Sequence, residues 1–463
     1  MNIESIHSVF FIGIGGIGMS ALARYFKACG KIVGGYDRQA TALSHELEDE
    51  GMLIHYIDDT DSIANMFLDK QTTLVVYTPA VPATNEHLKF FTHKGFAIRK
   101  RAEVVGDISN EKKNICVAGT HGKTSIATLI AHLLQNTSEK CNAFLGGISK
   151  NYNKNLLLQT KSEIFVVEAD EFDRSFLQLN PFVAVISSLD ADHLDIYEHE
   201  ENVKDAFKEF VGKIQNQGFL ILKHNLALKL KEEQNYFKYT YSLEDAEADY
   251  FATDIRLKNK SYVFSIATPT EVIQDVELGI GGLFNVENAI AAVAAIHVLG
   301  LCNAASVKKG LKSFAGIKRR FEFHVNEKNN IYIDDYAHHP KELETCINAI
   351  KELFPREKIL GIFQPHLYSR TRDFAAEFAE SLKLLDEVVL LDVYPAREKP
   401  IQGVNSELIL EKIENKNKTI STKKEVLDIV KKSEKEIIVT FGAGDISELV
   451  EPIKNIVKTR AKA

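Results

Sequence analysis

The chain has 463 residues, of which 45% are hydrophobic and 26% charged, and its formal net charge is −8. This length exceeds what one hydrophobic core normally organises, so we expect about three domains. The composition excludes a disordered or fibrous protein, and the negative charge argues against a dedicated nucleic-acid binder. Five widely spaced cysteines without a CxxC pair favour reduced thiols in a cytoplasmic protein.

Strand-like apolar runs alternate with helical patterns along the chain, which predicts α/β units with parallel sheets. The first runs cover residues 9–12, 32–36 and 73–77. Gly13, Gly15 and Gly18 follow the first run with the spacing of a dinucleotide-binding turn. Asp37 follows the second run, where a ribose-binding acid belongs. Alone, this pattern favours a nicotinamide dehydrogenase, with a tight turn that binds no ligand as the alternative.

The N-terminal run 9–23 is apolar enough to resemble a signal peptide. It contains four glycines, follows no basic segment, and is too short to cross a bilayer. No other run reaches the roughly 18 apolar residues of a membrane-spanning helix. We therefore expect an unprocessed protein without membrane insertion.

The most informative segment is the loop Gly119-Thr-His-Gly-Lys-Thr-Ser125, which follows the buried run 114–118 and precedes a helical pattern. Strand, glycine turn, lysine, hydroxyl residue and helix together form an arrangement that binds nucleoside triphosphates, because backbone N–H groups surround the phosphates. We expect Lys123 to add positive charge and Thr124 to ligate Mg²⁺. A full Walker loop would have glycine at Val117, so an ordinary tight turn is the alternative.

Two acidic segments follow predicted strands of the second sheet. Glu168-Ala-Asp-Glu-Phe-Asp173 follows the run 164–168, and Asp190-Ala-Asp-His-Leu-Asp195 follows the run 183–187. Carboxylates beside a triphosphate loop suit Mg²⁺, which prefers oxygen ligands. His193 would ligate a second divalent ion, and two ions would neutralise a transferring phosphoryl group. Charged loops that only cap helices are the structural alternative.

The rest of the chain predicts antiparallel strands within 249–274, a helix at 285–299 and a third α/β unit. Strands of that unit are predicted at 331–334, 359–363, 387–391 and 437–441. The polar stretch 411–436 indicates a solvated helical face. The loops 334–340 and 364–373 follow strands where open α/β sheets bind ligands. Their histidines and arginines would bind carboxylates or phosphates, or else are ordinary solvated side chains.

Five motifs occur in an order that resembles the Mur ligases, the ATP-dependent amide ligases of bacterial peptidoglycan synthesis. They are Gly119–Thr124, Glu168–Glu171, Asp192-His193, Arg319–Phe321 and Asp335–Pro340. The resemblance spans the whole chain. The glycine loop after residue 12, with the segments 363–373 and 393–396, is similar to the branch that joins L-alanine to the lactyl carboxylate of UDP-N-acetylmuramate through an acyl phosphate.

The resemblance implies a three-domain α/β fold with the substrates divided between the domains. The polar segment 107–113 predicts the first linker. We expect residues 1–107 to form a Rossmann-like domain that binds the UDP-sugar. Residues 108–316 would form a central P-loop-type ATPase α/β domain with some antiparallel strands. Residues 317–463 would form a C-terminal Rossmann-like α/β domain that receives the amino acid and closes over the others.

The resemblance also implies residue roles. The expected ATP-binding residues are Gly119, Thr120, His121, Gly122, Lys123, Thr124, Ser125, Asn285, Arg320 and Asp335. Among them, Lys123 and Arg320 would hold the γ-phosphate, and Asn285 and Asp335 would contact adenine and ribose. Thr124 and Glu168 would ligate one Mg²⁺ and His193 another. The expected UDP-sugar residues are Gly15, Gly16, Ile17, Gly18, Asp37, Thr78 and Arg101. His339 and Arg370 would meet the amino acid, and His339 or His338 would be the general base.

Three positions depart from the family pattern or leave an alternative open. Phe284 stands where the family often has histidine, and Leu367 where close relatives often carry a basic residue. Lys208 has the spacing at which some relatives carbamoylate a lysine, although a solvated helix lysine is the favoured interpretation.

The resemblance implies UDP-N-acetylmuramate, L-alanine and ATP as partners of a monomer or weak homodimer. The first alternative is a recycling ligase that attaches a tripeptide to the same sugar nucleotide. An NAD-dependent oxidoreductase and a P-loop switch that controls a partner are more distant alternatives, since neither requires both glycine loops and the carboxylate clusters.

Overall fold

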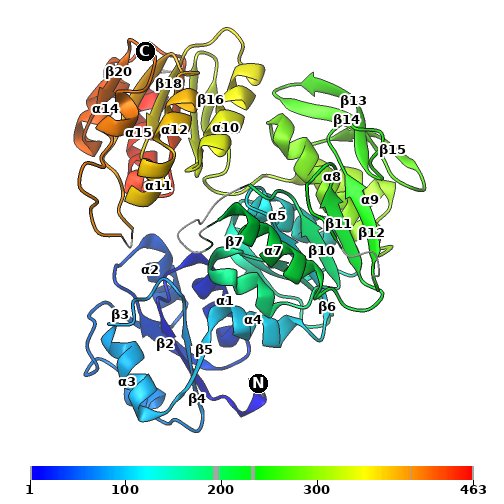
Figure 1. The fold of residues 1–463 in the computed structure, drawn as a ribbon, viewed down its shortest axis with the longest axis vertical. Helices are drawn as coiled ribbons and strands as arrows, with labels where there is room; N and C mark the ends of the chain where they lie inside the picture. The colour runs from blue at the N-terminus through cyan, green and yellow to red at the C-terminus, as the bar shows by residue number, and fades with distance from the viewer. Residues whose placement is uncertain (1–2, 191–196, 198, 231–234, 397, 461–463) are drawn as a thin grey trace. The chain divides into compact units, whose positions relative to one another are not determined.

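The structure is a computed structural model that describes residues 3–190, 197, 199–230, 235–396 and 398–460 (Figure 1). Its residues divide into two compact units. The first comprises Met1–Ile255, Val263–Glu277 and Glu287–Phe314, and the second Arg256–Tyr262, Leu278–Val286 and Ala315–Ala463. The first unit contains two large sheets and the second unit contains one.

The N-terminal sheet is fully parallel, with strand order β3-β2-β1-β4-β5. Its strands are β1 (Ser8–Ile12), β2 (Ile32–Tyr36), β3 (Leu53–His55), β4 (Thr73–Tyr77) and β5 (Ala97–Lys100), and its helices are α1 (Ile17–Ala28), α2 (Ala42–Asp49), α3 (Glu86–Lys94) and α4 (Arg101–Ser109). Every residue of β1 is buried, as expected for a central parallel strand covered on both faces. The segment predicted as a linker, 107–113, is instead the end of α4, a three-residue connection and the start of the next strand.

The central sheet is mixed, with order β12-β11-β10-β6-β9-β7-β8: β7 and β8 pair antiparallel, and the other neighbouring strands pair parallel. Its strands are β6 (Lys113–Ala118), β7 (Asn142–Ser149), β8 (Lys154–Leu157), β9 (Ile164–Glu168), β10 (Val183–Ile186), β11 (Phe219–Lys223) and β12 (Phe237–Tyr241). The helical elements are α5 (Lys123–Gln135), η3 (Phe172–Gln178), α7 (Glu200–Val211), α8 (Leu283–His297) and α9 (Ala304–Ser313). The antiparallel strands expected within 249–274 are found as a separate sheet of β13 (Phe251–Lys258), β14 (Ser261–Ala267) and β15 (Val272–Glu277).

The C-terminal sheet has the order β16-β17-β21-β18-β19-β20 and is parallel except for the antiparallel β16–β17 pair. Its strands are β16 (Glu322–Glu327), β17 (Asn330–Asp335), β18 (Ile359–Phe363), β19 (Glu387–Leu390), β20 (Lys418–Ile420) and β21 (Ile437–Phe441). Its helices are α10 (Pro340–Leu353), α11 (Tyr368–Asp373), α12 (Ala375–Leu382), α13 (Glu407–Leu410), α14 (Lys423–Lys432) and α15 (Val450–Arg460). The stretch 411–436 therefore holds a short edge strand as well as the predicted helix.

The expected α/β fold of three domains, with some antiparallel strands, is confirmed by the three large sheets. In the part of the chain that the structure describes, none of the helices has the length and hydropathy needed to span a bilayer.

Candidate active site

The lysine loop is a tight turn between β6 and α5. At two of its positions the backbone conformation requires glycine. Gly119 and Gly122 have φ angles of 131° and 83°. A Cβ at Gly119 would lie 2.9 Å from the backbone nitrogen of Ser188, just past the end of β10. The Ser188 hydroxyl accepts a hydrogen bond from the His121 N–H at 2.7 Å. The loop is therefore pressed against the end of the neighbouring strand and opens directly into α5.

Lys123, the first residue of α5, forms a buried ion pair. Its Nζ lies 2.8 Å from Oε2 of Glu171 and donates to the carbonyl of Gly119 at 2.7 Å. The side chains of Lys123 and Glu171 are 13% and 1% exposed. Burial opposes the charge on Lys123, but the carboxylates of Glu171, Asp170 and Glu168 outweigh it and raise the lysine pKa. Lys123 therefore stays protonated, and its ammonium group is held between Glu171 and the carbonyl of Gly119.

Glu168, at the end of β9, is held between the lysine loop and β7. Its Oε1 accepts a hydrogen bond from the Thr124 hydroxyl at 3.0 Å, and its Oε2 accepts one from the Gly146 N–H at 3.0 Å. A Cβ at Gly146 would lie 2.5 Å from Cδ of Glu168, so only glycine leaves room for this carboxylate. Gly146 was not anticipated from the sequence, where a glycine pair in an apolar run carries no motif.

Three further acidic positions of the two predicted segments have other partners or lie outside the described residues. Asp173 pairs with Lys100 of β5 at 2.7 Å, away from the loop. Asp190 donates its N–H to the Thr120 hydroxyl at 3.0 Å, and its carboxylate lies 3.5 Å from Nε2 of His121. The predicted second metal ligand, His193, lies outside the described residues, as does Asp192.

The N-terminal glycine loop contacts residues that follow β2 and β4 and the first residue of α4. The Gly15 N–H donates to Oδ2 of Asp37 at 2.8 Å, so Asp37 is engaged by the loop itself. A Cβ at Gly18 would lie 2.7 Å from an Arg101 guanidinium nitrogen, and one at Gly13 would lie 3.0 Å from the Thr78 methyl group. Gly16 caps α1, which begins at Ile17. The predicted UDP-sugar residues therefore form one cluster.

A small pocket in the first unit, with room for about one water molecule, has residues of α4, β9 and η3 in its wall. Its polar lining is Arg101, Glu168, Asp170 and Ser175. Arg101 starts α4 and approaches Gly18, whereas Glu168 accepts the hydrogen bond from Thr124. Residues expected to serve two different substrates thus line one cavity.

In the second unit, Asp335 at the end of β17 is buried beneath backbone donors. Its carboxylate accepts hydrogen bonds from Phe321 N–H at 2.6 Å and Ala337 N–H at 2.7 Å. Burial raises the pKa of Asp335 to about 6, although Arg320 and the two N–H groups favour its charged form. Phe321 makes an edge-to-face contact with Phe284 at 5.6 Å.

Asn285 follows Phe284 at the start of α8 and donates to the carbonyl of Gly281 at 2.8 Å. Phe284 therefore provides an aromatic ring next to Asn285 where the family often has histidine. Asn285 and Asp335, the residues expected at adenine and ribose, are linked through Phe284 and Phe321.

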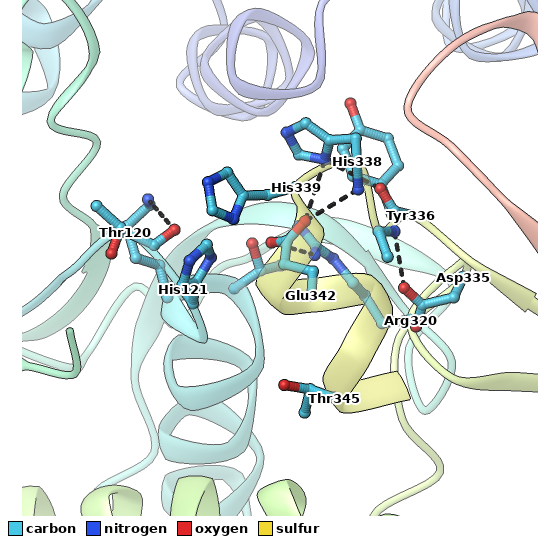
Figure 2. A network of polar contacts seen from close by, with 12 residues as sticks. Thr120, His121, Arg320, Asp335, Tyr336, His338, His339, Glu342 and Thr345 are labelled. Atoms are coloured by element: carbon cyan, nitrogen blue, oxygen red, sulfur yellow. Dashed lines mark hydrogen bonds and ion pairs between the residues drawn. The ribbon is translucent and has the colours of Figure 1, made fainter. Parts of the chain in front are cut away.

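Arg320 and His338 converge on Glu342 of α10 (Figure 2). The Arg320 guanidinium lies 3.9 Å from Oε1 of Glu342 and 4.9 Å from the centre of the Tyr336 ring. Nδ1 of His338 lies 3.0 Å from the carbonyl oxygen of Tyr336 and 3.3 Å from Oε2 of Glu342. Because both neighbours are acceptors, Nδ1 of His338 carries a proton, and in the neutral imidazole the lone pair is then on Nε2.

Arg319 braces the chain next to Arg320. Its backbone has a positive φ of 61°. Its guanidinium donates to Asp334 at 3.0 Å and to the carbonyl of Gly442 at 2.6 Å. Sequence reasoning gave no role to this residue, because its partners come from distant strand ends.

The residues expected to meet the amino acid lie on α10 and α11. His339 caps α10, and its Nδ1 accepts a hydrogen bond from the Lys341 N–H at 3.3 Å. Arg370 is a buried residue of α11, and Leu367 before it has a positive φ of 71°. In the first unit, Lys208 pairs with Asp205 at 2.7 Å on the surface of α7, as expected for a solvated helix lysine.

Three family models match successive parts of the chain. The Mur ligase family catalytic domain matches residues 8–113, the Mur ligase middle domain 117–296, and the Mur ligase glutamate ligase domain 319–444. Together these matches include both glycine loops, the carboxylate segments and the Arg319–Phe321 motif.

Full-length relatives agree with the family models. The UDP-N-acetylmuramate–L-alanine ligase of Porphyromonas gingivalis is 49% identical over 452 residues, covering 97% of this chain and 99% of that protein. The enzyme of the same description from Parabacteroides distasonis is 48% identical, with 98% of each chain covered. The crystal structure of a UDP-N-acetylmuramate–alanine ligase from Thermotoga maritima superposes with a TM-score of 0.80 at 25% identity, covering 98% of this chain and 99% of that one. This chain belongs to the Mur ligase family.

Proposed function

We propose that this protein is an ATP-dependent ligase that joins L-alanine to the lactyl carboxylate of UDP-N-acetylmuramate in peptidoglycan precursor synthesis. The identity of 48–49% over nearly the whole chain to ligases of that description supports this choice of substrates. The observation that carries the chemistry is the lysine loop, where Glu171 holds Lys123 as a buried cation and the Thr124 hydroxyl donates to Glu168. A carboxylate delivered there would lie next to the phosphoryl donor.

The reaction needs ATP because a carboxylate resists attack by an amine. Transfer of the γ-phosphoryl group to a carboxylate oxygen gives an acyl phosphate and ADP. The alanine amine then attacks the acyl carbon, the C–N bond forms, and the C–O bond to phosphate breaks. Positioned cations that stabilise charge on the transferring group supply most of the rate enhancement in such reactions.

We assign the phosphoryl site to the lysine loop and its partners. Lys123 would contact the γ-phosphate, and the backbone N–H groups of the loop at the start of α5 would surround the phosphates. The buried ion pair with Glu171 supports this role, because it keeps Lys123 charged and in place. Arg320 of the second unit would be a further cation for the γ-phosphate, and Asn285 and Asp335 would meet adenine and ribose.

Thr124 and Glu168 would hold Mg²⁺. Their oxygens lie 3.0 Å apart at the start of α5, and an all-oxygen donor set suits a hard divalent cation. When bound, Mg²⁺ would neutralise charge on the phosphate oxygens. From the sequence motif, we propose His193 as a ligand of a second Mg²⁺ ion.

The sugar nucleotide would lie on the first sheet. The loop Gly15–Gly18 at the N-terminus of α1, together with Arg101, would bind the diphosphate, since helix N-termini and guanidinium groups bind anions. Asp37 would shape this loop through its hydrogen bond from Gly15, and Thr78 would line it. For this division of substrates we propose domain boundaries after residues 107 and 316.

Of the two candidate bases, the geometry supports His338 better than His339. Glu342 and a carbonyl hold the Nδ1 proton of His338, so its Nε2 would take a proton from the alanine ammonium. Nδ1 of His339 already accepts a hydrogen bond from its own helix, which leaves the proton on its Nε2. His339 and the buried Arg370 would position the amino acid, with Arg370 on its carboxylate.

The reaction would take place in the cytoplasm, where free thiols persist, and all five cysteines are unpaired. We expect a monomer or weak homodimer.

The decisive experiment is a coupled ADP-release assay with the product identified by mass. We expect ADP release that requires both UDP-N-acetylmuramate and L-alanine, with UDP-N-acetylmuramoyl-L-alanine as the product. Replacing L-alanine by L-Ala-γ-D-Glu-diaminopimelate tests the recycling alternative. ADP release independent of either substrate, or preference for the tripeptide, would contradict the proposal.

A further inference from the structure

Asn155 of β8 is a fully buried amide that binds the first turns of α1. Its Nδ2 donates to the carbonyl of Ile17 at 2.7 Å and to the Ser20 hydroxyl at 2.9 Å. Its Oδ1 accepts a hydrogen bond from the Arg24 guanidinium at 2.7 Å. Both amide N–H groups and the amide oxygen therefore form hydrogen bonds. All three partners lie on α1, a helix of the N-terminal sheet region, whereas β8 belongs to the central sheet.

These contacts reach the sugar-nucleotide loop directly. Ile17 is the first residue of α1 and belongs to the glycine loop assigned to the diphosphate. Arg24 continues the connection, since it forms ion pairs with Glu46 at 3.1 Å and Glu50 at 2.8 Å near α2. An unmade hydrogen bond in this buried position would be costly, so the helix is strongly tied to β8.

β8 forms a hairpin with β7, and β7 extends to the proposed phosphoryl site. β7 pairs antiparallel with β8 and carries Gly146, whose N–H donates to Glu168. β7 also packs on α1, where the rings of Phe144 and Tyr25 lie 5.6 Å apart. One two-stranded element thus contacts the loop for one substrate and the carboxylate assigned to the other.

We propose that Asn155 is a positioning residue that aligns the bound sugar nucleotide with the γ-phosphate of ATP. This inference rests on the proposed function. Asn155 is not among the residues assigned to either substrate, so it contributes to their mutual placement and little to either affinity. A displacement of about 1 Å between reacting groups can lower a rate about 100-fold.

Asn142 provides a matched control on the same hairpin. It is a buried asparagine of β7 whose Nδ2 donates to the carbonyls of Gln159 and Ser162, at 3.3 and 3.0 Å. Its Oδ1 accepts from the Gln159 N–H at 2.8 Å. It makes the same kind of contacts as Asn155, but with the segment after β8 instead of α1.

The test compares Asn155→Leu, Asn155→Asp and Asn142→Leu in the full chain. For Asn155→Leu we expect kcat to fall about 10- to 100-fold while the Kd values of UDP-N-acetylmuramate and of ATP, each measured alone by calorimetry, change less than about threefold. Asn155→Asp keeps the acceptor for Arg24 but loses both donors, so its kcat should be intermediate. Asn142→Leu should lower the thermal midpoint comparably and leave kcat near wild type.

Three results would overturn the proposal. An unchanged kcat in folded Asn155→Leu or Asn155→Asp removes the alignment role. An equal fall of kcat in Asn142→Leu assigns the effect to general stability of the hairpin. A rise in the sugar-nucleotide Kd that accounts for the whole loss makes Asn155 a binding residue. Failure of the wild-type protein to form the alanine product is a separate outcome, which contradicts the proposed function itself.

Discussion

Replacing Gly146 with alanine should disable the proposed metal site while leaving the fold intact. A Cβ at this position would lie 2.5 Å from Cδ of Glu168, whereas ordinary contacts begin at 3.4 Å. The carboxylate must therefore move by roughly 1 Å, because β7 is held on both sides by β8 and β9. Glu168 is the group that yields, since it is the end of a flexible side chain.

The movement breaks the hydrogen bonds from Gly146 and Thr124 that now orient Glu168. A displacement of about 1 Å at a reacting centre lowers rates by about 100-fold, equivalent to about 2.7 kcal/mol in the activation free energy. Since Glu168 would hold Mg²⁺, the Mg²⁺ concentration for half-maximal activity should also rise.

The assay is coupled ADP release with saturating substrates over a series of Mg²⁺ concentrations. Gly212→Ala is the control, because Gly212 has a helical φ of −63° at the end of α7 and a Cβ there would come no closer than 3.3 Å to a neighbouring atom. Thermal unfolding of both variants should show midpoints within a few degrees of wild type. If Gly146→Ala keeps the wild-type kcat and Mg²⁺ dependence, the reasoning that glycine is required to seat Glu168 is refuted.

Further variants test the ion pair, the base and a buried carboxyl group. Lys123→Ala should abolish ligation and leave the calorimetric Kd of UDP-N-acetylmuramate near normal; loss of both would mean that the two sites are misplaced. It should also lower the free energy of unfolding by about 3 kcal/mol, because Glu171 keeps a buried charge without its cation. His338→Asn should block amide formation but still yield acyl phosphate, trapped with hydroxylamine as a hydroxamate. His339→Asn retains a good helix cap and should raise the KM of L-alanine, because His339 would position the amino acid, while kcat stays within about threefold of wild type. The reverse order of the two kcat values would identify His339 as the base. The raised pKa of Asp335, about 6 against 3.8, means that the native state binds more protons between these values. This group's contribution to the free energy of unfolding therefore falls by roughly 2 kcal/mol as pH rises from 4 to 7. Asp335→Asn should lack that component in urea unfolding at the two pH values, and an unchanged pH dependence would contradict it.

Central strands were predicted well because they are buried on both faces. The runs 73–77, 359–363 and 437–441 match β4, β18 and β21 at both ends. Parallel strands of this kind read as continuous apolar runs, which are visible without tertiary information.

Strands near sheet edges were missed. β16 and β20 at the two edges of the C-terminal sheet are partly exposed and carry charged residues, so their composition resembles that of loops or helices. β7 was missed because its glycines interrupt the apolar pattern, although they are what admits the Glu168 side chain. Such strands are specified by their partners more than by their own sequence.

The sequence alone determined the family, the alternation of strands and helices, and the two glycine loops, because these depend on short-range spacing. Only the tertiary structure decided which residues those loops contact. It turned Asp37 toward Gly15, seated Glu168 between Thr124 and Gly146, and brought Asn155 to α1. The physical reason is strand order: pairing places segments far apart in the chain side by side, and no local pattern records which strand will be the neighbour.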